Sequence, residues 1–203
     1  EIEPVSAPDY LRFLFEWQGL HEPAEGREGL AGALLRLEGF SAPGVAWEAQ
    51  LLPARVAGYA PHLLDELVSS GRYTWLRLAA ARGGGEGARR RPAPVRQTPI
   101  ALMAREHVAA WRAVAHSDTA PVLLPGGVAR RVLDLLRGNG ASFFADLLDS
   151  GLLRTQVEQA LAELVALGLV TADTFTGLRA LLTPAARRPG HGSGRRAYVP
   201  GVG

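Results

Sequence analysis

The 203-residue sequence contains neither cysteine nor lysine, and each absence excludes a group of functions. Without cysteine there is no disulfide framework, no thiolate metal ligand and no cysteine nucleophile. Without lysine, the phosphate-binding loop of P-loop ATPases cannot be completed and Schiff-base catalysis is impossible. All 22 basic side chains are therefore arginines. We expect neither ATP hydrolysis nor thiol chemistry from this chain.

Long apolar runs are also missing, although apolar residues make up 47% of the sequence and suffice for a buried core. The run from Leu161 to Val170 is interrupted by Glu163 and Gly168 and is shorter than the roughly 20 residues of a membrane span. The first four residues, 1–4, lack the basic start and apolar core of a signal peptide. We therefore expect a cytoplasmic protein without membrane contact.

The net charge of +2 conceals two basic segments. Residues 82–96 contain five arginines and one glutamate, and residues 184–203 contain four arginines and no acid, so each has a net charge of +4. The remainder of the chain must then carry −6. Cationic, glycine- and proline-rich segments on a mildly acidic body are typical of a protein that contacts a polyanion. The alternative, that both segments are only solvated loops, stays open.

An internal repeat indicates the architecture. Residues 64–74 align with residues 161–171 at a constant offset of 97, and glycine stands at the same place in both copies. In the second copy the apolar spacing predicts three helices, with Gly168 ending the third in a left-handed conformation and a strand following it. Three helices followed by a strand, with a turn between the second and third helix, is the order of a winged helix-turn-helix.

The first copy follows the same order, with a strand at 73–78 and a return strand at 98–103. Its helices are expected near 28–38, 43–52 and 61–70, with an extra helix at 9–17 and a connecting one at 106–115. The predicted fold class is mainly α with small antiparallel β wings, as tandem winged helix-turn-helix domains. The expected division is a first domain at 1–116 with an arginine-rich wing at 82–97, a linker at 117–126, a second domain at 127–183 and a flexible basic tail at 184–203.

The residues that could support catalysis do not have the spacing that known catalytic motifs require. The five histidines lack the helical spacing with glutamate that a zinc protease uses, so we expect no metal site. No nucleophile elbow exists, because His191 stands where the first glycine before Ser193 would be required. Asp65, Glu66 and Asp173 are acids without an evident catalytic partner. We expect no catalytic residue and no cofactor in this chain.

The pattern that remains is typical of nucleic-acid binding. On the third helix of the second copy, Thr155, Gln156 and Gln159 are expected to face outward, with Arg154 at the helix start. Residues in the first turns of a recognition helix reach base edges or phosphates. The alternative is an ordinary solvated helix face. The candidate nucleic-acid contacts are these four residues and the wing arginines Arg82, Arg89, Arg90, Arg91 and Arg96.

A family resemblance rests on five segments: residues 1–5 (EIEPV), 12–18 (RFLFEWQ), 52–56 (LPARV), 98–102 (TPIAL) and 151–157 (GLLRTQV). Together they resemble the C-terminal extension of the bacterial large helicase-related proteins (Lhr), and the similarity spans residues 1 to about 183. The resemblance implies ATP-dependent, 3′-to-5′ DNA repair helicases whose extension carries tandem winged helices and then a β-barrel. That extension is similar to AlkZ-type DNA glycosylases and is linked to uracil excision.

The resemblance implies partners but no catalytic residue here. In the family the ATPase motifs lie upstream of this region and the proposed glycosylase aspartate lies downstream, so neither maps onto this sequence. The implied partners are DNA, single- or double-stranded, the upstream helicase motor and the downstream β-barrel. Two alternatives stay open: a docking module that organises the parent protein or its oligomer without touching DNA, and a free-standing transcriptional regulator, which the lack of an obvious dimerisation helix disfavours.

Overall fold

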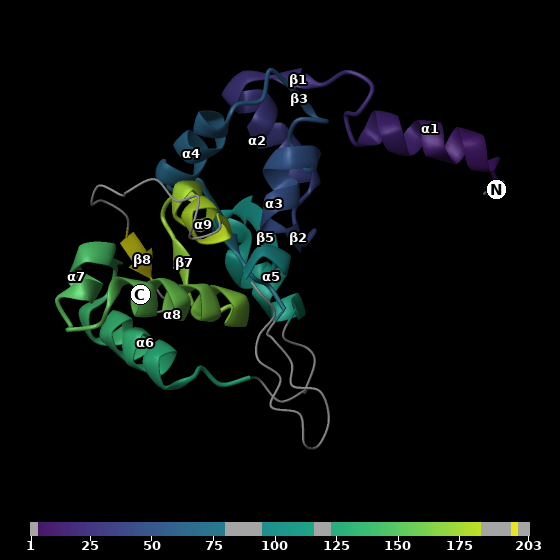
Figure 1. Ribbon diagram of the computed structural model, residues 1–203. Helices are drawn as coiled ribbons and strands as arrows, with labels where there is room; N and C mark the ends of the chain where they lie inside the picture. Colours follow the sequence, from purple (N-terminus) through teal and green to yellow (C-terminus); the bar gives the residue numbers. More distant parts are fainter. Residues whose placement is uncertain (1–3, 80–94, 116–122, 184–195, 199–203) are drawn as a thin grey trace.

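The computed structural model describes residues 4–79, 95–115, 123–183 and 196–198 (Figure 1). Four of the candidate wing arginines, Arg82, Arg89, Arg90 and Arg91, lie outside the described residues, and so do residues 117–122 of the expected linker. The described part is mainly helical and contains two small three-stranded sheets.

The first winged-helix unit is built from α2, the pair α3 and η1, and α4, packed against one sheet. Its helices are α2 (Gly26–Arg36), α3 (Gly44–Ala46), the π-turn η1 (Trp47–Leu51) and α4 (Pro61–Ser69), and its sheet strands are β2 (Ala42–Pro43), β4 (Tyr73–Leu76) and β5 (Pro99–Ala104). The sheet order is β2-β5-β4, and both pairings are antiparallel. A short parallel pair, β1 (Ala24–Glu25) with β3 (Val56–Ala57), closes the other end of this unit.

The second unit repeats this order. Its helices are α6 (Gly127–Asn139), α7 (Phe144–Leu148) and α8 (Arg154–Leu167), and its strands are β6 (Ser142–Phe143), β7 (Thr171–Ala172) and β8 (Arg196–Tyr198). The sheet order β6-β8-β7 matches that of the first sheet strand for strand. Gly71 and Gly168, at equivalent places in the repeat, have φ angles of 78° and 77°. The expectation of tandem winged helices, and of Gly168 as the left-handed end of α8, is confirmed.

Two elements differ from the expectation. Residues 196–198, placed by sequence in a flexible tail, form β8, which lies between β6 and β7 and pairs with the backbone of both. Helix α9 (Phe175–Leu182) follows β7, where the sequence analysis expected no helix. Its signal was present in the sequence, because Phe175, Leu178 and Leu182 have helical spacing and Thr174 caps the first turn by accepting a hydrogen bond from the Gly177 N–H.

The core of the first unit surrounds Trp47, which is fully buried between α2, α4 and the sheet. Its indole Nε1 donates a hydrogen bond to the Ile100 carbonyl of β5 at 3.0 Å. This bond satisfies the one polar atom of the ring and joins the second helix of the unit to the central strand. Leu30, Leu34 and Leu64 complete this part of the core with no exposed surface.

Helix α5 (Val108–Ala115), entered through the 3₁₀ turn η3 (Arg105–His107), covers the outer face of β4 and β5. The Glu38 carboxylate holds it there by accepting from the Ala104 N–H at 2.8 Å and lying 2.7 Å from His107 Nδ1 and 3.3 Å from Trp111 Nε1. Gly39 has a φ of 78°, and an added Cβ would come within 2.3 Å of the Trp111 ring. Glycine is therefore required where the chain passes this helix.

Helix α1 (Ala7–Trp17) projects from the body (Figure 1). None of its residues is buried, and Phe13 and Trp17 stack on each other with ring centroids 6.1 Å apart. Five large apolar side chains on it are at least half exposed: Tyr10, Leu11, Phe13, Phe15 and Trp17. The helix consequently contributes little to the core of either unit.

The two units share one hydrophobic core. Trp75 of β4 is buried, contacts the Phe175 ring edge-on at a centroid distance of 6.5 Å and donates from Nε1 to the Thr174 carbonyl at 3.0 Å. The Thr171 hydroxyl donates in turn to the Trp75 carbonyl. The apolar cluster is continuous from α2 of the first unit to α9 of the second.

Candidate nucleic-acid interface

Helix α8 is the third, or recognition, helix of the second unit, and its two ends have different surroundings. Seven of its residues are buried, most of them in its C-terminal half: Val157, Ala160, Leu161, Leu164, Val165, Ala166 and Leu167. Arg77 of the first unit donates to the Ala166 carbonyl, near the negative end of the helix dipole. Burial of its guanidinium lowers the pKa of Arg77. The first unit thus holds the C-terminal end of α8, and the first turns of α8 face outward.

The candidate residues of α8 lie together on these first two turns. Thr155 and Gln159 are exposed and Gln156 is partly exposed. Arg154 is half exposed, lies 3.2 Å from Glu158 through its Nε and has its guanidinium carbon 5.3 Å from the centre of the Phe144 ring. The Glu158 side chain is only 19% exposed, but Arg154 keeps half of its own surface open to solvent and is accessible to a further anion. The contact of these four candidate residues with nucleic acid stays a prediction.

Gln156 also has a structural contact that the sequence analysis did not foresee. Its side-chain oxygen accepts a hydrogen bond from the Leu153 backbone N–H at 2.9 Å, three residues back at the helix start. This is the return half of a capping box, in which the third helical residue satisfies an N–H that no turn of the helix can reach.

The capping contact predicts different effects for the two glutamines. We expect Gln156→Ala to lower the free energy of unfolding by about 0.5–2 kcal/mol, because it leaves the Leu153 N–H without its acceptor. We expect Gln159→Ala to change it by less than about 0.5 kcal/mol, because Gln159 is exposed. Urea unfolding of both variants measures the difference. Equal stability of the two variants would show that the cap contributes nothing.

Further arginines lie near α8. Arg131 of α6 donates to the Ser150 carbonyl at 2.8 Å, in the turn that leads to α8, and sequence reasoning missed it although Arg130 and Arg131 stand together in the sequence. Arg96 is exposed on the 3₁₀ turn η2 (Val95–Gln97), which contacts α3, α8 and α9. The structure therefore brings Arg96 and the second unit together, while Arg82 and Arg89–Arg91 lie outside the described residues.

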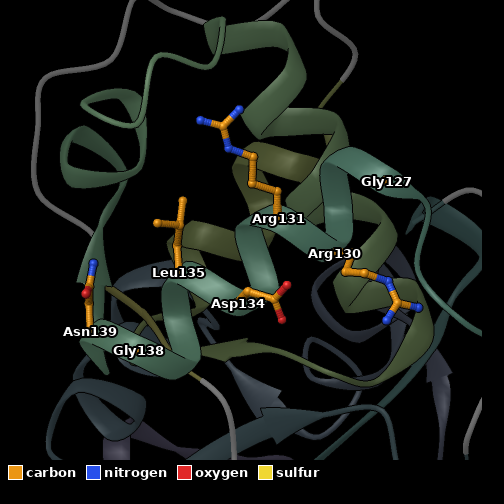
Figure 2. Close-up of a pocket in the computed structure, with 7 residues that line it drawn as sticks. All are labelled: Gly127, Arg130, Arg131, Asp134, Leu135, Gly138 and Asn139. Carbon is orange, nitrogen blue, oxygen red and sulfur yellow. The ribbon is translucent and has the colours of Figure 1, made fainter.

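A shallow groove of about 440 Å³ runs along the outer face of α6 (Figure 2). All seven lining residues come from this one helix: Gly127, Arg130, Arg131, Asp134, Leu135, Gly138 and Asn139. Figure 2 shows Arg130 and Arg131 extending away from each other, with Asp134 on the next turn of the helix. The groove is a surface hollow along one helix, without the convergent polar groups from several elements that an enzyme site uses.

The described residues contain neither a metal-binding cluster nor a membrane-spanning helix. Among residues 4–79, 95–115, 123–183 and 196–198, no three histidine, aspartate or glutamate side chains are grouped so that they could hold a metal ion. In the same part of the chain, no helix combines the length and the apolar character needed to cross a bilayer.

Two three-helix units with matching three-stranded sheets, and an outward-facing recognition helix on the second, define a tandem winged-helix protein. Residues 5–105 match the family model of the large helicase-related protein winged-helix domain. The chain is 34% identical over 211 aligned residues to the Lhr helicase/probable uracil glycosylase of Mycolicibacterium smegmatis, covering 98% of this chain and 12% of that protein. It is 28% identical over 200 residues to the Lhr helicase/uracil glycosylase of Escherichia coli, covering 88% of this chain and 12% of that protein.

The chain belongs to the large helicase-related (Lhr) family. The resemblance found in the sequence is thereby confirmed. The chain spans 12% of the length of each of these two relatives, so it matches one segment of each of them.

Proposed function

We propose that this chain is a DNA-binding segment of an Lhr-type, ATP-dependent DNA repair helicase. The observation that carries the proposal is the outward-facing start of α8, where Arg154, Thr155 and Gln159 lie on the exposed turns of a recognition helix. In winged-helix proteins this part of the third helix enters the major groove. The names of the two relatives, which include helicase and uracil glycosylase, support a role on DNA.

Charge supports the same proposal. The arginine-rich segment at 82–96 connects β4 to β5, the position of the wing, and supplies a net charge of +4. Phosphate contacts from such a segment add affinity without sequence information, whereas threonine and glutamine side chains on α8 can read base edges. The proposed division of labour is therefore positioning by the arginines and base contact by α8.

Salt titrations test this division. Each arginine–phosphate contact adds about 0.7 to 0.9 to the slope of log K against log salt concentration, because it releases counterions from the DNA. We expect Arg89, Arg90 and Arg91 replaced together by alanine to weaken binding to all sequences alike and to lower that slope by up to about 2 to 3. Gln159→Ala should leave the slope unchanged, since a neutral side chain releases no counterion.

The matched control removes three arginines from α1 and α2. Arg12, Arg27 and Arg36 lie on α1 and α2, which are far from α8 in Figure 1, and their joint replacement by alanine changes the net charge by the same amount. We expect this control to keep most of the affinity and slope. Equal losses in both triple variants would mean a diffuse charge effect, and no salt-dependent DNA binding by the parent chain would refute the proposed function.

A further inference from the structure

Helix α9 of the second unit lies on the helix-turn-helix of the first unit. It contacts α3 and α4. Helix α4 is the third helix of the first unit, which is the position of a recognition helix, and α3 belongs to the helical segment before it. Gly44, the first residue of α3, is buried, and a Cβ added there would meet Leu182 at 3.0 Å and Leu178 at 3.4 Å. The absence of a side chain at position 44 is thus what lets α9 approach so closely.

Charged side chains fix α9 in this position. Arg179 lies 2.7 Å from Glu48 and 2.9 Å from Asp65, and these three side chains are only 25%, 17% and 27% exposed. Arg179 also donates through Nη2 to the Pro61 carbonyl, at the first residue of α4, at 3.2 Å. Burial alone would lower the pKa of Arg179, but its hydrogen bonds to Glu48 and Asp65 and their charges outweigh burial and raise that pKa.

Both carboxylates have a second role in the contact. The other oxygen of Asp65 accepts from the Thr176 backbone N–H at 3.0 Å, so a residue of the first unit caps the first turn of α9 in the second. The other oxygen of Glu48 accepts from the Tyr59 hydroxyl at 2.9 Å. Burial, together with the charge of Glu48, raises the pKa of Tyr59 and keeps it a neutral donor. Each carboxylate is thus already satisfied by protein donors, and one of these, Arg179, carries a positive charge that a nucleic acid does not supply.

The chemistry of this face suits a cationic helix and not a phosphate backbone. Glu48 and Asp65 are negative, and the exposed residues of α4 include His62 and Glu66 but no arginine. A phosphate brought to the same place would meet two carboxylates and would have to displace Arg179. By contrast, α8 begins with an arginine and carries neutral polar side chains on its exposed turns.

We infer that the helix-turn-helix face of the first winged helix is a protein-docking site for α9, and that α8 is the recognition helix that this tandem presents to DNA. The docking of α9 is inferred from the contacts alone. The assignment of α8 as the helix that meets DNA rests on the proposed function. The first unit thereby takes the docking role that the sequence left open, and the second unit keeps the nucleic-acid role.

Docking is tested without nucleic acid. We expect a double-mutant cycle of Asp65→Ala and Arg179→Ala, followed by urea unfolding of the whole chain, to give a coupling factor of about 5 to 100 in the unfolding equilibrium constant. A factor near one overturns the docking site.

A second test uses hydrogen exchange. Gly44→Leu should speed hydrogen exchange of the α9 amides, since the new side chain occupies the place of Leu178 and Leu182. Gly32→Leu, where nothing lies within 4 Å of an added Cβ, is the matched control. Unchanged exchange in α9 of the Gly44→Leu variant also overturns the docking site.

The choice of α8 is tested with duplex DNA and the whole chain. We expect Thr155→Ala with Gln159→Ala to weaken binding by at least about 5-fold, as the loss of base contacts does. His62→Ala with Glu66→Gln on α4 should change the affinity by less than about 2-fold. Weakening by the α4 pair equal to that by the α8 pair overturns the inference. If the parent chain binds no DNA, the assignment of α8 fails with the proposed function, and the docking tests decide the docking of α9.

Discussion

Replacing Trp47 with alanine is expected to lower the free energy of unfolding by about 4–8 kcal/mol. Loss of a buried tryptophan costs about 3–5 kcal/mol through lost transfer energy and the cavity that remains. A further 1–3 kcal/mol comes from the Ile100 carbonyl, which loses the indole N–H that donates to it. Because whole domains are stable by only about 5–15 kcal/mol, this variant is expected to be largely unfolded at 37 °C.

Two further tryptophan variants separate these contributions. Trp47→Phe keeps an aromatic ring but removes the donor, so we expect a loss of about 1–3 kcal/mol. Trp17→Ala on α1 should change stability by less than about 0.5 kcal/mol, because Trp17 is 61% exposed. Urea unfolding followed by far-UV circular dichroism measures all three. Similar losses for Trp17→Ala and Trp47→Ala would mean that α1 belongs to the core.

Replacing Phe175 with alanine is expected to destabilise both winged helices together, by about 3–5 kcal/mol. Phe175 is fully buried, packs edge-on against Trp75 of the first unit and lies beneath the Arg179 guanidinium at 5.4 Å. The core is continuous between the units, so the chain should unfold in one transition and the variant should shift that transition as a whole.

Fluorescence and hydrogen exchange in urea test the shared transition. Trp47 and Trp75 belong to the first unit. If Phe175→Ala shifts the urea midpoint of the tryptophan fluorescence transition, the two units are therefore coupled. Phe143→Ala is the control, because Phe143 of the same second unit is 37% exposed, and it should cost less than about 1 kcal/mol. If Phe175→Ala shifts only the exchange of α6 to α9, the two units unfold independently.

Much of the fold could be predicted because it depends on local patterns. The repeat at an offset of 97 residues placed both recognition helices and the strands that follow them. Apolar spacing gave α8, and Gly168 ended it as expected, since the left-handed conformation there needs no tertiary partner to be favourable for glycine. Pro99 begins β5, at a strand entrance where proline is tolerated.

The site was predicted less completely, because side-chain contacts depend on neighbours that are remote in sequence. The pattern of α8 indicated that Thr155 and Gln159 face outward, and both are exposed. It did not indicate that Gln156 caps the helix or that Arg131 reaches the turn before α8. Asp65 read as a solvated acid with no partner, but it holds Arg179 at a separation of 114 residues.

The sequence by itself determined the winged-helix order, its duplication and the functions that a chain without cysteine or lysine cannot have, because periodicity, turn residues and composition are local properties. Only the tertiary structure decided that the two units share one core and that α9 covers the helix-turn-helix of the first unit. The position of α9 depends on the ion pairs that Arg179 forms with Glu48 and Asp65. The free energy of these contacts comes from burial and charge pairing between residues that are distant in sequence, and no local sequence pattern contains that information.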